Sequence, residues 1–315
     1  MKQTIDVLCI GDSVMDTLVG PVDSSIFTRD MTYVDNIVLF PGGDAQNQAR
    51  ALGRLNVNAG IYAVVGNDPN GHNIKQGLEK HNVNVDYLLF REDIPTLNNI
   101  VVVHRDANRS LISSAIRAEL KPEDMDLSVI EQVNKAVSYA SFFISPEFDV
   151  KAPEIFKFAK ARELLVFADT VQNRKKTTLD YFYNSFQYID YFFPNLEEGM
   201  FFSGQEDLDA ICDFFINKGI KTVVLKLGAQ GCLIKSKAER IYVPGFKIEA
   251  LDTTGSGDNF AAGFISAVLE GLDLEEAAIR ANATGAMTAQ NVGSENGYCN
   301  LSEVLDFIKK NTKSL

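Results

Sequence analysis

Cysteine and histidine are scarce in this sequence, and neither is spaced like a set of metal ligands. The 315 residues include three histidines and four scattered cysteines, namely Cys9, Cys212, Cys232 and Cys299. No CxxC pair occurs and no zinc-ligand spacing is present, which argues against a zinc module. Scattered cysteines without a disulfide framework are typical of a reducing compartment, so we expect a cytoplasmic protein.

Positive charge is outnumbered by negative charge, and long apolar runs are absent. Lys and Arg number 30 against 42 Asp and Glu, and the formal net charge is −12 at pH 7. This balance argues against nucleic acid or an anionic membrane as a partner, although a local cradle on a negative protein can still hold a phosphorylated ligand. No apolar run reaches the length of a membrane span, and the first residues are too short and interrupted for a signal peptide.

Short apolar runs alternate with helical patterns along most of the chain. The strand-like runs are Ile5–Ile10, Ile61–Val65, Ala140–Ile144, Leu164–Ala168 and Thr222–Leu227. The helical patterns are Asp44–Leu55, Gly71–His81, Ala152–Arg162, Leu208–Lys218, Asn259–Glu270, Leu274–Gln290 and Leu301–Lys310. This alternation predicts βαβ units and a mostly parallel sheet.

Two β-rich regions interrupt the alternation. Thr32–Phe40 lacks a following turn of its own kind, and Leu97–His104 and Arg109–Ser113 flank a sequence typical of a hairpin turn. We expect these stretches to form a small sheet outside the main one, a lid, with an edge extension of the main sheet as the alternative. The length fits one α/β domain with an insertion as well as two domains, and no flexible linker separates the chain into parts.

The most informative segment is Asp252-Thr253-Thr254-Gly255-Ser256-Gly257-Asp258, which leads into an apolar helical stretch. The first turn of a helix has unpaired N–H groups and a dipole that favours negative charge, and glycines let an oxyanion approach closely. A carboxylate beside such a cradle could take the proton of a hydroxyl that attacks a phosphoryl group. The alternative is an ordinary helix start with Ser256 as the N-cap. Walker A and GxGxxG sequences are absent, so the segment is neither a P-loop nor a dinucleotide fingerprint.

Two segments in the first fifty residues carry further polar candidates. Gly42 and Gly43 precede a helical pattern in which Asn47 lies one turn in, where its amide can both donate to and accept from a ligand hydroxyl. The alternative is a tight turn with Asp44 near a helix N-terminus. Asp16 follows the first strand, at the end where open α/β sheets bind ligands, and a carboxylate there can accept hydrogen bonds from vicinal hydroxyls.

Two later segments have a structural and a functional interpretation each. Asn195 and Glu198 would share a helix face and could hold Mg²⁺ through water, but the same spacing is typical of a helix cap, which we favour for the segment taken alone. The segment from Lys226 through Gly228 to Gly231 could shape a nucleotide pocket or form a simple hairpin.

Taken together, these segments resemble the ribokinase/PfkB family of carbohydrate kinases from Gly11 to Gly297. Asp252–Asp258 is similar to the family's DTxGAGD signature, with Ser256 in place of the usual Ala. Gly42 to Asn47 resembles the GGxxxN signature, and Asn195 to Glu198 fits the NxxE motif. The resemblance implies a ribokinase-like three-layer α/β fold with a mostly parallel central sheet and a small β lid. The expected organisation is a single domain over 1–315 with lid strands inserted at about 13–40 and 92–117.

The resemblance also implies a role for each matching residue. Asp258 would be the catalytic base, and the N–H groups of Gly255, Ser256 and Gly257 would form the anion hole. Sugar hydroxyls would be bound by Asp16, Gly42, Gly43 and Asn47. The nucleotide and its Mg²⁺ would be held by Asn195, Glu198 (through water), Lys226, Gly228, Gly231 and Asn282. In some members a monovalent cation binds at the positions of Asp252, Thr254, Gly293 and Ser294, which implies K⁺ as a further cofactor.

The implied function is an ATP-dependent sugar kinase that transfers the γ-phosphoryl group to a hydroxyl of a small carbohydrate. Two alternatives remain: a nucleoside kinase, with Tyr33 and Phe40 of the lid as a wall for the base, and a catalytically silent sugar or nucleotide sensor. Asp44 stands where ribokinase-like sequences often have Lys, so ribose itself is not implied. The lid pairs two subunits in several members, which implies a homodimer.

Overall fold

A computed structural model describes residues 4–105, 109–171, 179–291 and 299–311. Nine strands form the main sheet in the order β13-β12-β11-β10-β9-β8-β1-β4-β5. Neighbours from β11 to β5 run parallel, and β12 and β13 are antiparallel additions at one edge, so the predicted mostly parallel sheet is confirmed. The strands are β1 Ile5–Ile10, β4 Ala59–Gly66, β5 Leu88–Arg91, β8 Val133–Phe142, β9 Leu165–Thr170, β10 Tyr191–Phe192, β11 Thr222–Lys226, β12 Cys232–Ser236 and β13 Arg240–Val243.

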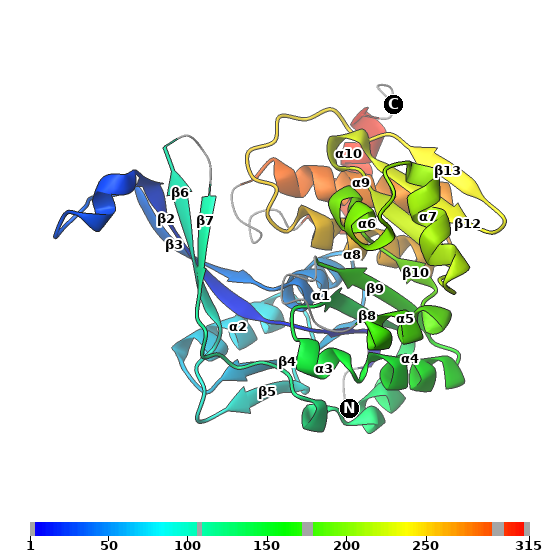
Figure 1. The fold of residues 1–315 in the computed structure, drawn as a ribbon, viewed down its shortest axis with the longest axis horizontal. Coiled ribbons are helices and arrows are strands. Elements are labelled where there is room, and N and C mark those ends of the chain that lie inside the picture. Colours follow the sequence, from blue (N-terminus) through cyan, green and yellow to red (C-terminus); the bar gives the residue numbers. More distant parts are fainter. Residues whose placement is uncertain (1–3, 106–108, 172–178, 292–298, 312–315) are drawn as a thin grey trace.

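Helices cover both faces of this sheet, giving three layers (Figure 1). One buried apolar cluster joins the sheet to α4 Ala152–Ala161, α5 Asp180–Ser185, α6 Leu196–Ser203 and α7 Leu208–Asn217. The other joins it to α1 Asp44–Arg54, α2 Pro69–Lys80, α8 Ser256–Glu270, α9 Leu274–Ala289 and α10 Leu301–Asn311. A short helix, α3, spans Pro146–Asp149. Strands buried on both faces explain the continuous apolar runs of the sequence.

Local sequence signals fix where several helices start. Asp68 caps α2 by accepting the N–H of Gly71, with Pro69 as the first helical residue. Asp273 and Glu276 form a reciprocal capping box at α9. Side-chain oxygens at these positions satisfy N–H groups that have no partner inside the helix. The helices of the outer layers therefore begin where their own residues dictate.

A separate four-stranded sheet stands beside the main body, with the order β3-β2-β6-β7 (Figure 1). Its strands are β2 Val14–Val22, β3 Asn36–Gly42, β6 Asn98–His104 and β7 Arg109–Ser113. We call these four strands the lid sheet. Because it pairs with none of the nine main strands among the described residues, the alternative of an edge extension is wrong.

Several predicted boundaries need correction. Helix α8 begins at Ser256, three residues before the predicted start, because Gly255 adopts the left-handed conformation that ends the loop. Strand β8 begins at Val133, seven residues before the predicted Ala140. It stops at Phe142, where the prediction ran to Ile144, since Phe143 has a φ of 73°. In the lid sheet, β3 begins at Asn36 and leaves Thr32 outside the strand. In the described part of the chain, no helix is both long and apolar enough to cross a membrane.

Candidate active site

The polar candidates gather at the carboxyl ends of the parallel strands. Asp12 follows β1, Asp169 lies at the end of β9, Asn195 follows β10, and Lys226 is the last residue of β11. All parallel strands of a sheet end at one edge, and open α/β folds bind ligands there. The main sheet therefore brings together residues that lie more than two hundred positions apart in the sequence.

The loop before α8 has the geometry of an anion-binding turn. Gly255 is the N-cap residue with φ 75° and ψ −1°, a left-handed conformation that suits glycine. The Ser256 N–H donates to the Thr253 carbonyl at 3.1 Å, whereas no hydrogen bond among the described residues uses the N–H of Gly255 or Gly257. Ser256 is the first residue of the helix, so the interpretation of Ser256 as the N-cap is wrong. Two backbone donors at the positive end of α8 thus remain available for an anion.

Asp258 lies in the first turn of α8 and is 8% exposed. Its Oδ2 accepts a hydrogen bond from the Asn47 amide of α1 at 2.8 Å, which joins two segments of the predicted site. Burial and the nearby Asp44 carboxylate raise the pKa of Asp258 well above the usual carboxyl range, and the Asn47 hydrogen bond opposes this rise. A buried, hydrogen-bonded carboxylate next to N–H groups that have no partner among the described residues has the placement of a general base.

Asp16 and Gly42 meet at the base of the lid sheet. Asp16 lies on β2, and its Oδ1 accepts a hydrogen bond from the Asn99 amide of β6 at 2.8 Å. A Cβ atom on Gly42 would lie 2.2 Å from Asp16 Oδ2, so any larger residue at position 42 would displace this carboxylate. Gly43, with φ 94°, is the N-cap of α1, and Asn47 follows one turn later. All four predicted sugar-binding residues therefore lie around the start of α1.

Two further carboxylates lie here that sequence reasoning did not place in the site. Asp12 Oδ1 accepts the N–H of Asp44 at 3.0 Å, and the Ser141 hydroxyl donates to Asp44 Oδ2. Burial and the Asp44 charge raise the pKa of Asp12 to about 7. The position of Asp12, immediately after the first strand, was a signal for this placement, whereas Ser141 follows no motif.

Asn195 and Glu198 form a reciprocal cap at the start of α6. The Asn195 N–H donates to Glu198 Oε2 at 2.8 Å, and the Glu198 N–H donates to Asn195 Oδ1 at 2.9 Å. The structural interpretation of this pair is therefore confirmed, and a role in binding stays a prediction. Burial raises the pKa of Glu198 to about 7, with Lys226 opposing the rise and Asp169 adding to it.

Lys226 reaches into the same region from the end of β11. Its ammonium donates to Asp169 Oδ2 at 2.7 Å, and the two side chains are 14% and 6% exposed. Burial raises the pKa of Asp169 to about 6 even though Lys226 opposes the rise. Sequence reasoning missed Asp169, although a carboxylate at the end of a buried parallel strand is a recognisable signal.

A pocket of about 290 Å³ opens beside the Gly255–Gly257 loop. Its lining includes Lys226, Gly228, Gly231, Ser256, Gly257 and Asn282, and the remaining wall is mostly alanine, phenylalanine and isoleucine. Gly231 has φ 97°, and a Cβ there would lie 2.1 Å from the Val243 carbonyl oxygen. The amide of Asn282 donates to the carbonyls of Val243 and Pro244 at 3.3 and 3.1 Å. The β11–β12 turn is thus both a hairpin and a wall of the pocket.

The predicted monovalent-cation residues are only partly described. Asp252 is buried, and its Oδ1 accepts the N–H of Thr254 at 2.8 Å. Gly293 and Ser294 lie outside the described residues. Among the described residues, no group of three or more His, Cys, Asp or Glu side chains is arranged to enclose a metal.

Comparison with known proteins gives a consistent result. The model of the pfkB family of carbohydrate kinases matches residues 4–299. A 2-dehydro-3-deoxygluconokinase of Bacillus subtilis is 34% identical over 120 residues, covering 38% of this chain and 37% of the relative. A deoxyribokinase of Salmonella typhi is 23% identical over 98% of this chain and 100% of its own length. The structure of an Arabidopsis thaliana ribokinase complexed with ribose and ATP superposes with a TM-score of 0.83 at 23% identity, covering 97% of this chain and 99% of that one.

Proposed function

The chain belongs to the pfkB family of carbohydrate kinases, and on that premise we propose that it transfers the γ-phosphoryl group of ATP to a hydroxyl of a small carbohydrate, with Asp258 as the general base. Members of this family are phosphotransferases with an alcohol group as acceptor. The observation that carries the proposal is the buried Asp258 carboxylate, which is hydrogen-bonded to Asn47 and follows Gly257, whose N–H has no hydrogen bond among the described residues.

The acceptor site in this proposal is the space between α1, β2 and Asp258. Asp16, Gly42, Gly43 and Asn47 hold the hydroxyl groups of the sugar, since carboxylate and amide side chains accept their hydrogen bonds. Asp258 takes the proton from the reacting hydroxyl as its oxygen attacks phosphorus. Because this step needs little covalent help, positioning and charge stabilisation supply most of the acceleration.

The phosphoryl side of the site is the loop before α8. The N–H groups of Gly255 and Gly257 receive the negative charge that develops on the transferring group, while the Ser256 N–H would have to leave the Thr253 carbonyl to join them. Gly228, Gly231 and Asn282 line the pocket for the nucleotide, and its apolar wall suits the flat face of a base. Asn282 shapes this wall through its bonds to Val243 and Pro244.

Magnesium fits the residues near Glu198. Mg²⁺ keeps several waters and is held by one or two carboxylates together with substrate phosphates, so a closed protein cage is not needed. Glu198 supplies one buried carboxylate beside Asp169, and Asn195 holds it in place through the cap. When bound, the ion supplies positive charge against the phosphate oxygens. We also propose K⁺ at Asp252 and Thr254, because the buried Asp252 carboxylate lies at the start of the anion-binding loop.

The nucleoside alternative keeps only one of its two expected lid aromatics near the site, since Phe40 lies opposite Asp16 in the lid sheet. Tyr33, one of the two lid aromatics expected to stack on a base, is 90% exposed. The silent-sensor alternative would leave the arrangement of Asp258, Asn47 and the free N–H groups without a purpose. We therefore place a sugar in the acceptor site, and we propose that the lid sheet pairs two subunits.

The decisive test is the variant Asp258→Asn in a coupled ADP-release assay over pentoses, hexoses, keto acids, inositol and nucleosides. We expect kcat to fall by about 10²–10⁴-fold while ATP still binds in calorimetry, because the amide keeps the size of the side chain but cannot take a proton. Asp213→Asn, which changes an exposed carboxylate on α7, serves as the control and should act as wild type. Wild-type turnover by Asp258→Asn would show that the base has been assigned wrongly.

A further inference from the structure

Lys226 occupies an unusual position for a structural ion pair. Its side chain lines the pocket beside the anion-binding loop, and a Cβ atom built on Gly257 would lie only 3.6 Å from its ammonium. The same ammonium donates to Asp169 Oδ2 at 2.7 Å. Lys226 therefore lies next to the start of α8 and donates to a buried carboxylate.

The backbone holds Lys226 in this place. Its N–H donates to the Pro194 carbonyl at 2.9 Å, and Lys226 and Asn195 form an isolated parallel β-bridge. These backbone contacts fix the end of β11, from which the Lys226 side chain reaches the pocket beside the anion-binding loop. Burial works against the protonated form, but Asp169, Glu198 and Asp258 together raise the pKa of Lys226, so the ammonium keeps its charge.

A second buried aspartate, Asp190, forms ion pairs with two lysines, Lys160 and Lys221. Lys160 donates to Asp190 Oδ2 at 2.6 Å, and Asp190 is 5% exposed at its side chain. This pair lies before β10, at the amino ends of the parallel strands, and among the described residues it lines none of the pocket beside α8. The two pairs have nearly the same contact distance, but only the Lys226 pair faces the anion-binding loop.

We propose that Lys226 is a catalytic residue whose ammonium contacts the transferring phosphoryl group, and that Asp169 is the positioning residue that aims it. This proposal rests on the proposed function of the site. A bond forms between the acceptor oxygen and the γ-phosphorus while the bond to the β,γ-bridging oxygen breaks, and its electron pair leaves with ADP. The acceptor proton goes to Asp258. Lys226 keeps its proton and offsets the charge on the phosphoryl oxygens, as cationic clamps do in phosphoryl transfer.

The experiment uses Lys226→Met, the double variant Lys226→Met/Asp169→Asn, and Lys160→Met as a control in which Asp190 keeps its ion pair with Lys221. Methionine keeps much of the stem length without the charge, and the double variant leaves no buried carboxylate unpaired. Each purified protein is assayed for kcat and KM with its best acceptor. Calorimetry then measures the affinity for ADP alone and for ADP with Mg²⁺ and fluoroaluminate, a mimic of the transferring phosphoryl group.

For Lys226→Met we expect kcat to fall by about 10²–10³-fold with an unchanged KM for the acceptor. Affinity for the fluoroaluminate complex should fall by a similar factor, while ADP alone binds as it does to wild type. The double variant should be as slow as the single one, and Lys160→Met should keep wild-type kcat.

Recovery of wild-type kcat in the double variant would overturn the proposal, because the defect would then come from an unpaired Asp169. Full kcat in Lys226→Met would overturn it as well. If the wild type is active and either of these results is found, only the role of Lys226 is contradicted. A wild type that phosphorylates no acceptor contradicts the proposed function itself.

Discussion

The pKa of the Asp258 carboxyl group is set by the residues around it. Burial and the Asp44 charge favour its protonated form, while the Asn47 amide and the Lys226 ammonium favour the ionised form that can act as a base. The net effect is a pKa of Asp258 above the usual carboxyl range, with burial as the largest cause. In the proposed mechanism, activity is present above this pKa and is lost as the pH falls through it.

The pH dependence of kcat/KM tests this balance at the residue scale. We expect an acid limb at a higher pH than the usual carboxyl range, reporting Asp258 in the free enzyme. Asp44→Asn removes one of the two main causes of the raised pKa, so the acid limb should move to lower pH. Asp209→Asn, on the far helix α7, is the control and should leave the limb in place. An acid limb that stays put or rises in Asp44→Asn would refute the assignment.

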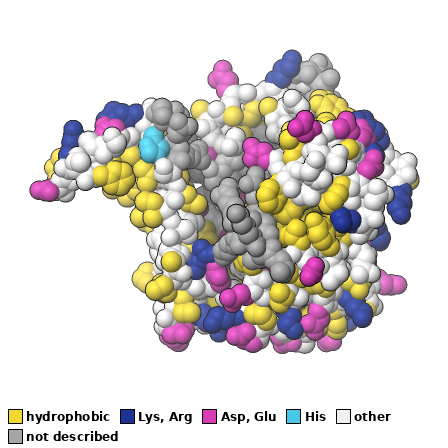
Figure 2. Space-filling model, in the orientation of Figure 1, with side chains coloured by type: hydrophobic (Ala, Val, Ile, Leu, Met, Phe, Trp, Pro, Cys, Tyr) yellow, Lys and Arg dark blue, Asp and Glu magenta, His cyan; other side chains and the backbone are white. Residues whose placement is uncertain are grey.

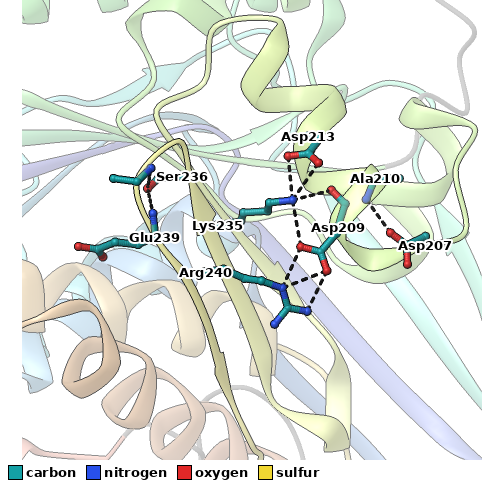
Figure 3. Close-up of polar contacts among 9 residues, drawn as sticks. Asp207, Asp209, Ala210, Asp213, Lys235, Ser236, Glu239 and Arg240 are labelled. Atoms are coloured by element: carbon teal, nitrogen blue, oxygen red, sulfur yellow. Dashed lines mark hydrogen bonds and ion pairs between the residues drawn. The ribbon is translucent and has the colours of Figure 1, made fainter.

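At the scale of elements, helix α7 is tied to the antiparallel edge of the main sheet by charge (Figure 3). Asp209 accepts three hydrogen bonds from Arg240 of β13, at 2.8, 2.9 and 3.0 Å, and lies 2.9 Å from the ammonium of Lys235 of β12. Lys235 also pairs with Asp213 at 2.8 Å. Hydrogen bonds from Arg240 and Lys235 lower the pKa of Asp209 to about 2. Because these side chains are partly exposed, each pair contributes less than its geometry suggests.

Asp209→Asn should lower the free energy of unfolding by about 1 kcal/mol at neutral pH, measured by urea titration. The depressed pKa of Asp209 means that its contribution is present above the usual carboxyl pKa and is lost as the pH falls toward the folded value. The difference from wild type should therefore shrink at acid pH. Glu206→Gln, an exposed neighbour, should change neither value. A difference that persists unchanged in acid would mean that charge is not the cause.

At the scale of the whole molecule, the lid sheet is the part without a partner layer. Strand register places Leu39, Ile100 and Ile112 on one face. Thr17 lies opposite both Leu39 and Ile100, and Ile100 lies opposite Ile112. The opposite face carries Asp16, Asn99 and Phe40. Leu39 and Ile112 are 53% and 55% exposed, and Figure 2 shows hydrophobic side chains along the arm that this sheet forms. An exposed apolar face of this kind is typical of a protein–protein contact.

We therefore expect the protein to be a homodimer in solution, with the lid sheets of two copies in contact. The double variant Leu39→Asp/Ile112→Asp should elute as a monomer in size-exclusion chromatography with light scattering, since burying two carboxylates in the contact is unfavourable. Leu305→Asp changes a comparably exposed leucine on α10 and should leave the dimer intact. A monomeric wild type, or a dimeric double variant, would contradict this expectation.

The sequence by itself determined the layers and much of the site's membership. Continuous apolar runs define strands buried on both faces, and period and caps define the helices around them. A glycine in a turn indicates a backbone conformation that other residues rarely adopt. Gly43, Gly231 and Gly255 could therefore be singled out before their positive φ values were known. These signals are local, and a local signal can be read from the residues that carry it.

Only the tertiary structure decided which of these residues come into contact and how their pKa values shift. The contact of Asn47 with Asp258 spans 211 positions, and the pairing of Lys226 with Asp169 spans 57, so neither leaves a mark in the neighbouring sequence. The raised pKa of Asp258 and the placement of Asp12 and Asp44 follow from burial at the common edge of the strands. The burial of a titratable group and the electrostatic field at that group depend on every element packed around it. Both therefore arise only in the folded chain.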